Sequence, residues 1–168
     1  TNKELRSNFR DLIRWAFLKN DYSTVVSYLR SVPDLKDSLR LKDYTNTDAW
    51  TAYRIGESLR QMGEFQEALF YHMKACELAP FDLDFRIKLA LLQDNMGRFQ
   101  EARASYEYIL NQNPELASVH VNYGFIILRM ENNPSKARLH YEKALALDPD
   151  NVQAMINMSG IFLYMNDI

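Results

Sequence analysis

The sequence contains little cysteine, no long apolar run and no excess of positive charge. Its single cysteine, Cys76, excludes a framework of intramolecular disulfides. No uninterrupted apolar stretch approaches the ~20 residues that a membrane-spanning helix requires, so we expect no membrane insertion. The formal net charge of -2 argues against nucleic-acid binding, which usually needs a basic surface. These features leave the compartment open, with a slight preference for the cytoplasm.

Glycine and proline are also scarce, with five residues of each in a chain of 168. Helix-forming residues dominate, and apolar residues recur at spacings of three or four positions rather than two. The apolar content of 47% is sufficient for a substantial core. The composition therefore predicts an all-α protein.

One short motif occurs twice at an interval of 34 residues. The segment Gly63–Ala68, with the sequence GEFQEA, matches Gly97–Ala102, with the sequence GRFQEA. Three prolines, Pro80, Pro114 and Pro149, follow one another at intervals of 34 and 35 residues. A constant interval of this length indicates a tandem array in which each unit is one supersecondary element.

The array resembles the tetratricopeptide repeat family, in which each unit consists of two antiparallel helices. The family's small residues, which let the two helices approach closely, fall on Gly56, Ala68, Ala75, Ala90, Ala102, Gly124, Ala137 and Ala144. His72 stands where the later units have Tyr106 and Tyr141, so the aromatic position is not constant. The resemblance implies an all-α fold, a right-handed superhelix (an α-α solenoid) of antiparallel helical hairpins.

The repeat register also predicts how the chain is divided. We expect a degenerate N-terminal hairpin in residues 1–48, with its turn at Asn20–Val25 and a short connecting helix around Leu35–Leu41. The repeat array is expected over residues 49–168, as the units 49–82, 83–116 and 117–151 and the half-unit 152–168. Because residue 168 falls where the second helix of a unit should begin, we expect this chain to be a fragment of a longer array.

In the family that the chain resembles, the first helix of each unit lines a concave groove, and fixed positions of that helix face a bound partner. The expected partner-binding residues are Trp50, Tyr53, Glu57, Ile87, Lys88, Leu91, Asn95, Val121, Asn122, Phe125, Arg129, Ile156, Asn157 and Tyr164. One end of this groove is polar and the other apolar, and an apolar patch of that size usually binds a protein. An extended peptide or an amphipathic helix would fit it. The alternatives are that a terminal segment of the full protein fills the groove, or that a tight superhelix shields it.

Two classes within the family bear on the partner. The chaperone-binding class grips a C-terminal carboxylate with lysine and asparagine. Those positions here hold Tyr53, Glu57, Ile87, Leu91, Val121 and Phe125, so we expect no binding of chaperone tails. Protein O-GlcNAc transferases use successive asparagines to contact a peptide backbone. Asn122 and Asn157 match that position, although asparagine is also common there in ordinary repeats.

No set of residues in the sequence indicates catalysis. His72 and Cys76 lie four residues apart on an expected helix, but no third or fourth metal ligand follows at a suitable spacing. His120 and His140 have no evident carboxylate partner, and carboxylates such as Glu107 are interpreted as solvated helix faces. There is no glycine-rich phosphate loop and no nucleophile motif. We therefore expect no enzyme activity, no metal and no cofactor.

These observations favour a protein-protein interaction module, a scaffold or adaptor that binds another protein or peptide in its groove. The alternative is a regulatory or substrate-docking segment of a larger enzyme, of which glycosyltransferases are one example. A further hypothesis is self-association, because the last helix would present Met155, Met158, Phe162 and Met165 as an open apolar end. The sequence does not identify the partner.

Overall fold

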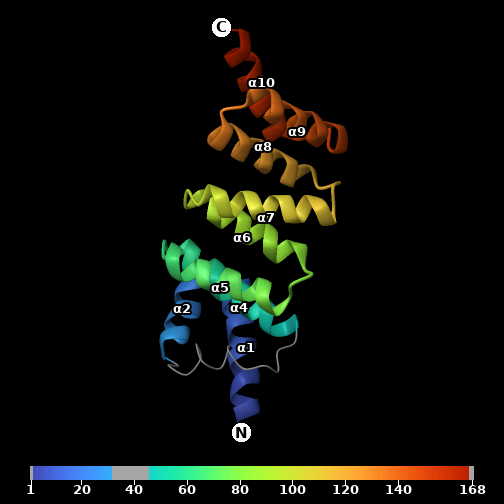
Figure 1. Cartoon of the computed structure of the whole chain (residues 1–168). Helices are drawn as coiled ribbons and strands as arrows, with labels where there is room; N and C mark the ends of the chain where they lie inside the picture. Colours follow the sequence, from blue (N-terminus) through green and yellow to red (C-terminus); the bar gives the residue numbers. More distant parts are fainter. Residues whose placement is uncertain (1, 32–45, 167–168) are drawn as a thin grey trace. The chain divides into compact units, whose positions relative to one another are not determined.

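The computed structural model describes residues 2–31 and 46–166, and throughout these two stretches the regular secondary structure is α-helix (Figure 1). The prediction of an all-α fold is therefore confirmed. The connecting helix predicted around Leu35–Leu41 lies outside the described residues.

The contacts divide the chain into two compact bodies, residues 1–89 and residues 90–168. The N-terminal body contains α1 (Asn2–Leu18), α2 (Tyr22–Ser31), α4 (Asn46–Gln61), α5 (Phe65–Leu78) and the first part of α6 (Leu83–Asn95). The C-terminal body contains the rest of α6, α7 (Phe99–Gln112), α8 (Ala117–Glu131), α9 (Pro134–Leu147) and α10 (Val152–Asn166). The boundary predicted at residue 48 was derived from the repeat register, and it does not coincide with the boundary between the two compact bodies. It stays a prediction.

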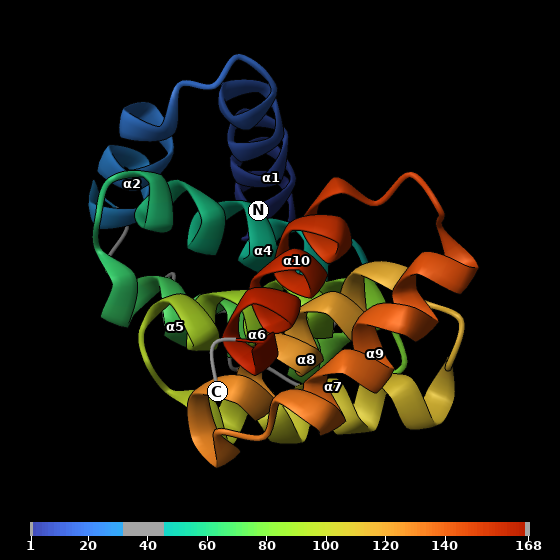
Figure 2. The ribbon, with the colours of Figure 1, turned by 90° about the horizontal axis from the view of Figure 1, so that it is seen from above.

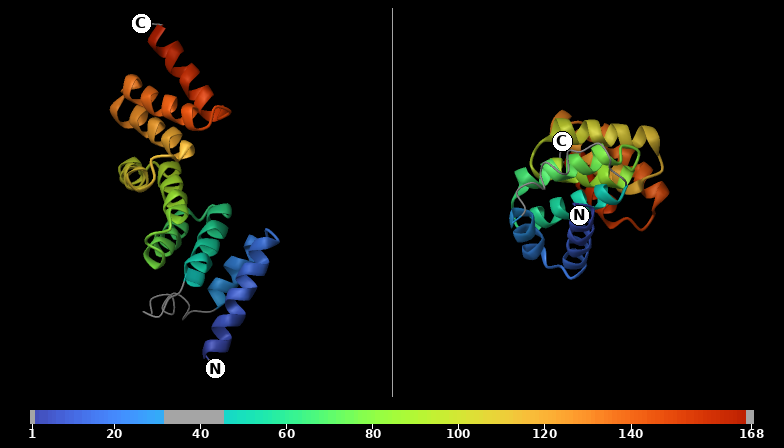
Figure 3. Two further views of the ribbon diagram at one scale, coloured as in Figure 1. Left: turned by 90° about the vertical axis from the view of Figure 1, so that its right-hand side faces the viewer. Right: turned by 90° about the horizontal axis from the view of Figure 1, so that it is seen from below.

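Within each body, helices that are neighbours in the sequence pack together. In the N-terminal body α1 packs on α2, and α4 packs on α5. In the C-terminal body α8 packs on both α7 and α9, and α10 packs on α9. Figure 2 shows α1 and α2 side by side, and Figure 3 shows the two orange helices α8 and α9 as a similar pair. The structural unit is therefore a helical hairpin.

Each hairpin turns through one residue with a positive φ, which is Asn20, Gly63, Gly97 or Asn132. In the first three turns the amide after that residue donates to a carbonyl five positions back, at 2.8–2.9 Å: Asp21 to Ala16, Glu64 to Leu59, and Arg98 to Gln93. Glycine adopts this left-handed conformation without steric cost, and asparagine tolerates it better than most residues. The turn at Asn20 therefore has the geometry of the two glycine turns.

The turn between α8 and α9 differs because the extra residue of this repeat lengthens α8, so that only Asn132 and Asn133 lie between the two helices. The amide of Asn132 donates to the carbonyl of Leu128 at 3.1 Å. The side chain of Asn133 then caps α9 by accepting from the amide of Lys136 at 2.9 Å. Pro134 begins α9, where its missing N–H costs nothing and its fixed φ favours the helix. This shorter turn thus still provides hydrogen-bond partners for the ends of both helices.

The core of the N-terminal hairpin uses large apolar residues at helical spacing. Phe9, Ile13 and Ala16 of α1 are buried, and so are Val25 and Leu29 of α2. Burial of each larger side chain stabilises the fold by about 1.5–3 kcal/mol relative to exposure. The degenerate hairpin is therefore held together by the same kind of packing as the clearer repeats.

In the α4–α5 and α8–α9 hairpins, a glycine of the first helix lies directly against a ring of the second. A Cβ atom built on Gly124 would lie 2.7 Å from Cε1 of Tyr141, and one built on Gly56 would lie 3.0 Å from Cδ2 of His72. Tyr141 and His72 are both buried, so neither ring has open space into which to retreat. These glycines are therefore required by the position of the facing ring.

The last helix, α10, packs on α9 through residues at helical spacing. Ala154, Met158 and Ile161 are buried, and Met158 is only 8% exposed. The expectation that Met158 belongs to an open apolar end is wrong, because it lies on the inward stripe between Ala154 and Ile161. The other three residues named in that hypothesis are exposed.

Replacement of Gly124 by alanine should destabilise the C-terminal body. The new methyl group would displace the Tyr141 ring, and overpacking of this kind costs about 1–3 kcal/mol, more than the gain of about 1 kcal/mol in helix propensity. Urea unfolding followed by circular dichroism measures the difference.

Gly160→Ala is the matched control, because α10 leaves open space around the Cβ position of Gly160. We expect this variant to gain up to about 1 kcal/mol from helix propensity alone. A Gly124→Ala variant as stable as Gly160→Ala would contradict the requirement for glycine in α8.

Candidate functional site

Five of the residues predicted to bind a partner belong to the N-terminal body, and they are Trp50, Tyr53 and Glu57 of α4 and Ile87 and Lys88 of α6. All five are at least partly accessible, and Trp50 is 40% exposed. With the half-buried Arg54 they form a surface that we call the N-terminal A-helix face. The structure thus brings together in one body all five residues that the sequence predicted there.

An aromatic cluster holds the exposed ring of this face in place. The Trp50 ring lies edge-on to Tyr53 at 5.6 Å and to Phe85 at 4.9 Å between ring centroids. Tyr53 also contacts Phe17 of α1 at 6.2 Å. Phe85 is buried and was not among the predicted residues, because the repeat register assigns its position to the core. Edge-to-face aromatic pairs add about 0.5–1.5 kcal/mol each to stability, so these contacts hold the Trp50 ring in position.

The carboxylate of Glu57 already has partners within its own helix. Nε of Arg60 donates to it at 2.9 Å, and the amide of Gln61 donates at 2.8 Å. Burial alone would raise the pKa of Glu57, but these hydrogen bonds outweigh it and hold the pKa below its usual value. Glu57 therefore remains ionised at neutral pH and has little capacity left for a ligand.

The other nine predicted residues lie in the C-terminal body and are Leu91, Asn95, Val121, Asn122, Phe125, Arg129, Ile156, Asn157 and Tyr164. Eight of them are accessible to some degree, and we call these eight the C-terminal A-helix face. Phe125 is 39% exposed and Ile156 is 59% exposed. The apolar character that the sequence predicted for this part of the molecule is therefore present on its surface.

Val121 does not belong to this face. It is only 3% exposed, and its neighbours Val119, His120, Tyr123 and Gly124 are buried as well. The buried sector of α8 is wider than the general rule for the repeat predicts. The prediction of Val121 as a partner-binding residue is therefore corrected.

Arg129 is the most firmly positioned charge on the C-terminal A-helix face. Its guanidinium lies 5.5 Å from the ring centroid of Phe99 and 5.9 Å from that of Phe125. Such cation–π contacts are worth about 0.5–1 kcal/mol at exposed sites. Burial raises the pKa of nearby Asp94, and the charge of Arg129 opposes that change. The face therefore carries the Arg129 charge beside the exposed ring of Phe125, with Asp94 nearby.

The two predicted asparagines are not equivalent in their contacts. The side-chain oxygen of Asn157 accepts a hydrogen bond from Gln153 at 3.1 Å. Both asparagines are half-buried on first helices of their hairpins. The contact with Gln153 uses only one acceptor position of Asn157, so its amide N–H groups could still donate to a peptide backbone.

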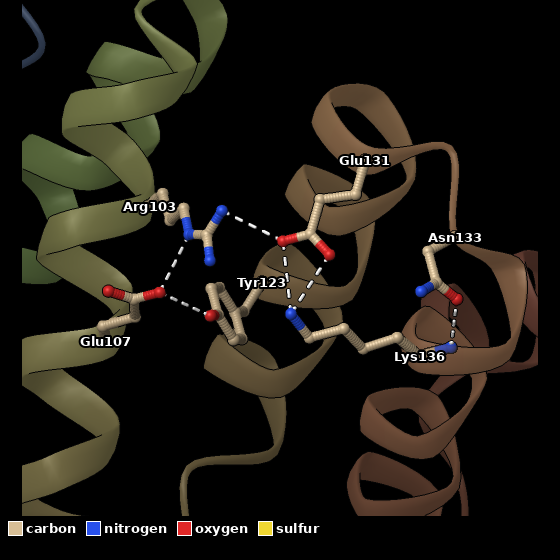
Figure 4. A network of polar contacts seen from close by, with 6 residues as sticks. All are labelled: Arg103, Glu107, Tyr123, Glu131, Asn133 and Lys136. Atoms are coloured by element: carbon tan, nitrogen blue, oxygen red, sulfur yellow. Dashed lines mark hydrogen bonds and ion pairs between the residues drawn. The ribbon is translucent and has the colours of Figure 1, made fainter.

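A polar network joins α7, α8 and α9 away from the predicted residues (Figure 4). Arg103 donates to Glu107 and to Glu131, both at 2.9 Å, and Lys136 binds Glu131 at 3.1 Å. The Tyr123 hydroxyl donates to Glu107 at 2.7 Å. Glu107 lies on a partly exposed helix face, as expected, and two donors there hold its carboxylate and lower its pKa. All the charges shown are paired, which favours a role in orienting the helices.

His72 is buried, and neither of its ring nitrogens has a hydrogen-bond partner within the described parts of the chain. Burial lowers the pKa of His72 to about 4, because a charged imidazole would be desolvated there. The ring is therefore neutral at physiological pH. Its burial against Gly56 agrees with its place as a core residue.

His120 and His140 are partners of each other, a pairing that the sequence did not reveal. Their Nδ1 atoms lie 3.0 Å apart, and Nε2 of His120 lies 2.9 Å from the carbonyl oxygen of Pro114. Since the carbonyl can only accept, His120 donates through Nε2, and its Nδ1 then accepts from His140. Burial, and then the proximity of His120 and Lys136, lower the pKa of His140.

Among the residues that the structure describes, no group of three or more histidine, cysteine, aspartate and glutamate side chains is placed to hold a metal ion. The same residues include no helix with the length and apolar character needed to cross a membrane.

Sequence models of the tetratricopeptide repeat match residues 51–82 and residues 86–115. Among curated proteins, mouse Protein O-mannosyl-transferase TMTC3 is 26% identical over 135 residues. That match covers 72% of this chain and 14% of the relative, so the chain spans about a seventh of that relative's length.

Solved structures agree with the fold. A tetratricopeptide repeat protein from Parabacteroides merdae has a TM-score of 0.76 at 19% identity, over 92% of this chain and 58% of that one. YrrB, described as a tetratricopeptide repeat protein with an unusual peptide-binding site, has a TM-score of 0.72 at 22% identity. The match covers 88% of this chain and 71% of YrrB.

Burial of a neutral His72 predicts that the N-terminal body loses stability in acid. Its folded pKa of about 4 lies below the ordinary value of about 6.5, so the unfolded state binds more protons and stability falls as the pH decreases from about 6.5 toward 4. We expect this group to remove about 2 kcal/mol between pH 7 and pH 5. Urea unfolding followed by the fluorescence of Trp15 and Trp50, which both belong to this body, measures the loss.

His72→Phe is the test variant, since Tyr106 and Tyr141 fill the equivalent buried positions in later repeats. The variant should lose about 2 kcal/mol less than the wild type over the same pH interval. An unchanged pH dependence would show that His72 is not the group responsible.

Proposed function

This chain belongs to the tetratricopeptide repeat family, and we propose that it is a protein-interaction module whose A-helix faces hold a peptide or helix of another protein. In this role it is a scaffold or adaptor, and it catalyses no reaction itself. The repeat fold is generally a non-catalytic scaffold for interactions. Nucleic acid is not the expected partner, because the chain has a net charge of -2.

The observation that carries the proposal is the exposure of large apolar residues on the first helices of the C-terminal body. Phe125 on α8 and Ile156 on α10 are both accessible, although neighbouring apolar positions of these helices are buried. Asn122, Asn157 and Arg129 accompany them with polar groups. An apolar surface bordered by a few polar groups is typical of a site that binds another protein.

The arrangement favours a peptide or a single helix over a large globular surface. The apolar side chains lie on α8 and α10, and polar side chains accompany them on the same helices. A bound peptide can place alternate side chains toward such a row and use its backbone for the amides of Asn122 and Asn157. The peptide-binding site of the structurally similar YrrB supports this assignment by analogy.

A second candidate is a regulatory or substrate-docking segment of a larger enzyme. The match to Protein O-mannosyl-transferase TMTC3 favours it, because that relative is named as a transferase and is much longer than this chain. Both candidates assign protein binding to these residues. The reading frame on either side of residues 1–168 distinguishes them, since only the second requires a transferase domain in the same chain.

Peptide display against the wild-type chain tests the proposed function. We expect peptides to be selected, and we expect Phe125→Asp with Ile156→Asp to weaken their binding at least about tenfold, because each variant places a charge in the apolar contact. Fluorescence anisotropy with labelled selected peptides measures the change.

Leu139→Asp is the matched control, because Leu139 is 65% exposed on α9, outside the A-helix faces. It introduces one aspartate on the same body and should change the affinity less than about twofold. Selected peptides that bind the double variant as tightly as the wild type, or that lose affinity equally with Leu139→Asp, would contradict the proposal.

Self-association through α10 stays a prediction. Phe162 and Met165 are exposed there, and no charged residue occurs between Val152 and Asn166. We expect light scattering to show a mass that increases with protein concentration, and Phe162→Asp to restore the monomer. A monomer at every concentration would count against this prediction.

A further inference from the structure

Two arginines on adjacent helices of the N-terminal body have no role in the fold described above. Arg54 lies on α4 and Arg14 lies on α1, and these helices pack against each other. Figure 3 shows the blue α1 beside the teal α4. The ring contact between Phe17 and Tyr53 lies one helical turn after Arg14 and directly before Arg54. The two arginines therefore extend from neighbouring parts of one packed helix pair.

Arg54 is half-buried, and among the residues that the structure describes it has no anionic partner. Its guanidinium lies over the Trp50 ring, 5.7 Å from the centroid. No hydrogen bond or ion pair links it to an oxygen atom of any residue that the structure describes. Burial, and then the like charge of Arg14, lower the pKa of Arg54. Both effects make the charged form of Arg54 less favourable than it would be in water.

A comparison with Arg138 shows that stacking alone does not explain this arrangement. Arg138 lies over the Phe162 ring at 5.2 Å, and its Nε also donates to Glu142 at 2.7 Å. Charged groups that leave water are usually paired, because desolvation of an unpaired charge is unfavourable. Arg54 has the same aromatic support as Arg138 but not the carboxylate.

We propose that Arg14 and Arg54, with Trp50 as an apolar support, bind a glutamate or aspartate side chain of an acidic peptide segment. A planar guanidinium matches a carboxylate through two parallel hydrogen bonds. The bound carboxylate satisfies the unpaired charge of Arg54 and relieves its repulsion from Arg14. Trp50 contacts the apolar part of the same segment. This inference rests on the proposed function and names the chemistry of its partner.

Charge complementarity favours a carboxylate over a phosphate. Glu57 lies one helical turn after Arg54, and the exposed Asp11 lies one turn before Arg14. These carboxylates repel any anion, and they repel a phosphate more because it carries about -1.5 to -2 charge at pH 7. Attraction and repulsion both scale with the charge of the ligand, whereas the cost of removing the ligand from water rises with the square of its charge. Beside the half-buried Arg54, a singly charged carboxylate is therefore favoured over a phosphate.

Fluorescence anisotropy with three short labelled peptides tests the inference. The peptides share one glycine- and serine-based sequence and differ only in a central pair of residues, which is glutamate, glutamine or phosphoserine. We expect the glutamate peptide to bind most tightly and to weaken as salt is added. Arg54→Gln should weaken that peptide about tenfold, and Arg14→Gln should weaken it less, because Arg14 is exposed.

Arg138→Gln is the matched control, since it removes a stacked arginine that already has a carboxylate partner. It should change the affinity for the glutamate peptide less than about twofold, and circular dichroism should show that all three variants remain folded. Equal binding of the glutamate and glutamine peptides would overturn the inference. So would tighter binding of the phosphoserine peptide, or an equal effect of Arg54→Gln and Arg138→Gln.

Failure of this inference is distinguishable from failure of the proposed function. If peptides obtained by display still bind and are weakened by Phe125→Asp with Ile156→Asp, protein binding stands and only the acidic specificity is wrong. If the glutamate peptide binds through Arg54 while display yields nothing that depends on the C-terminal A-helix face, the acidic site stands by itself.

Discussion

The close contact between a small residue in one helix and a ring in the next is the constraint on which the hairpins depend. Gly124 meets Tyr141, and Gly56 meets His72, at distances that leave no space for another methyl group. With the helices this close, large residues fill the remaining inward positions and are buried on both sides. The outward positions of the first helices are then left for other contacts. The packing of the core therefore determines which residues are available to bind a partner.

Much of the fold followed from residues that can be counted in the sequence. The interval between Gly63 and Gly97 predicted the hairpin turns, and both glycines adopt the positive φ that such turns require. Asn20 takes the same conformation in the degenerate first hairpin. These predictions succeeded because backbone geometry at a turn depends on one or two local residues. The predicted division of the chain into repeat units stays a prediction.

The candidate site was less predictable, because exposure depends on the sizes of neighbouring side chains. Val121 and Met158 occupy positions assigned to the surface, yet both are buried. Arg54 was not among the predicted residues, and the influence of Arg14 on it depends on two helices that are far apart in the sequence. The pairing of His120 with His140 is likewise a tertiary contact. The repeat register assigns each position separately, so it cannot predict such contacts between helices.

The central claim is that the first helices of the hairpins bind the partner and the second helices hold the fold. Amide chemical-shift changes in the nitrogen-15-labelled chain, on addition of a peptide selected by display, test it most directly. The account predicts that the changes concentrate on α4, α6, α8 and α10 and that α5, α7 and α9 remain nearly unchanged. Changes centred on α5, α7 and α9 would contradict it.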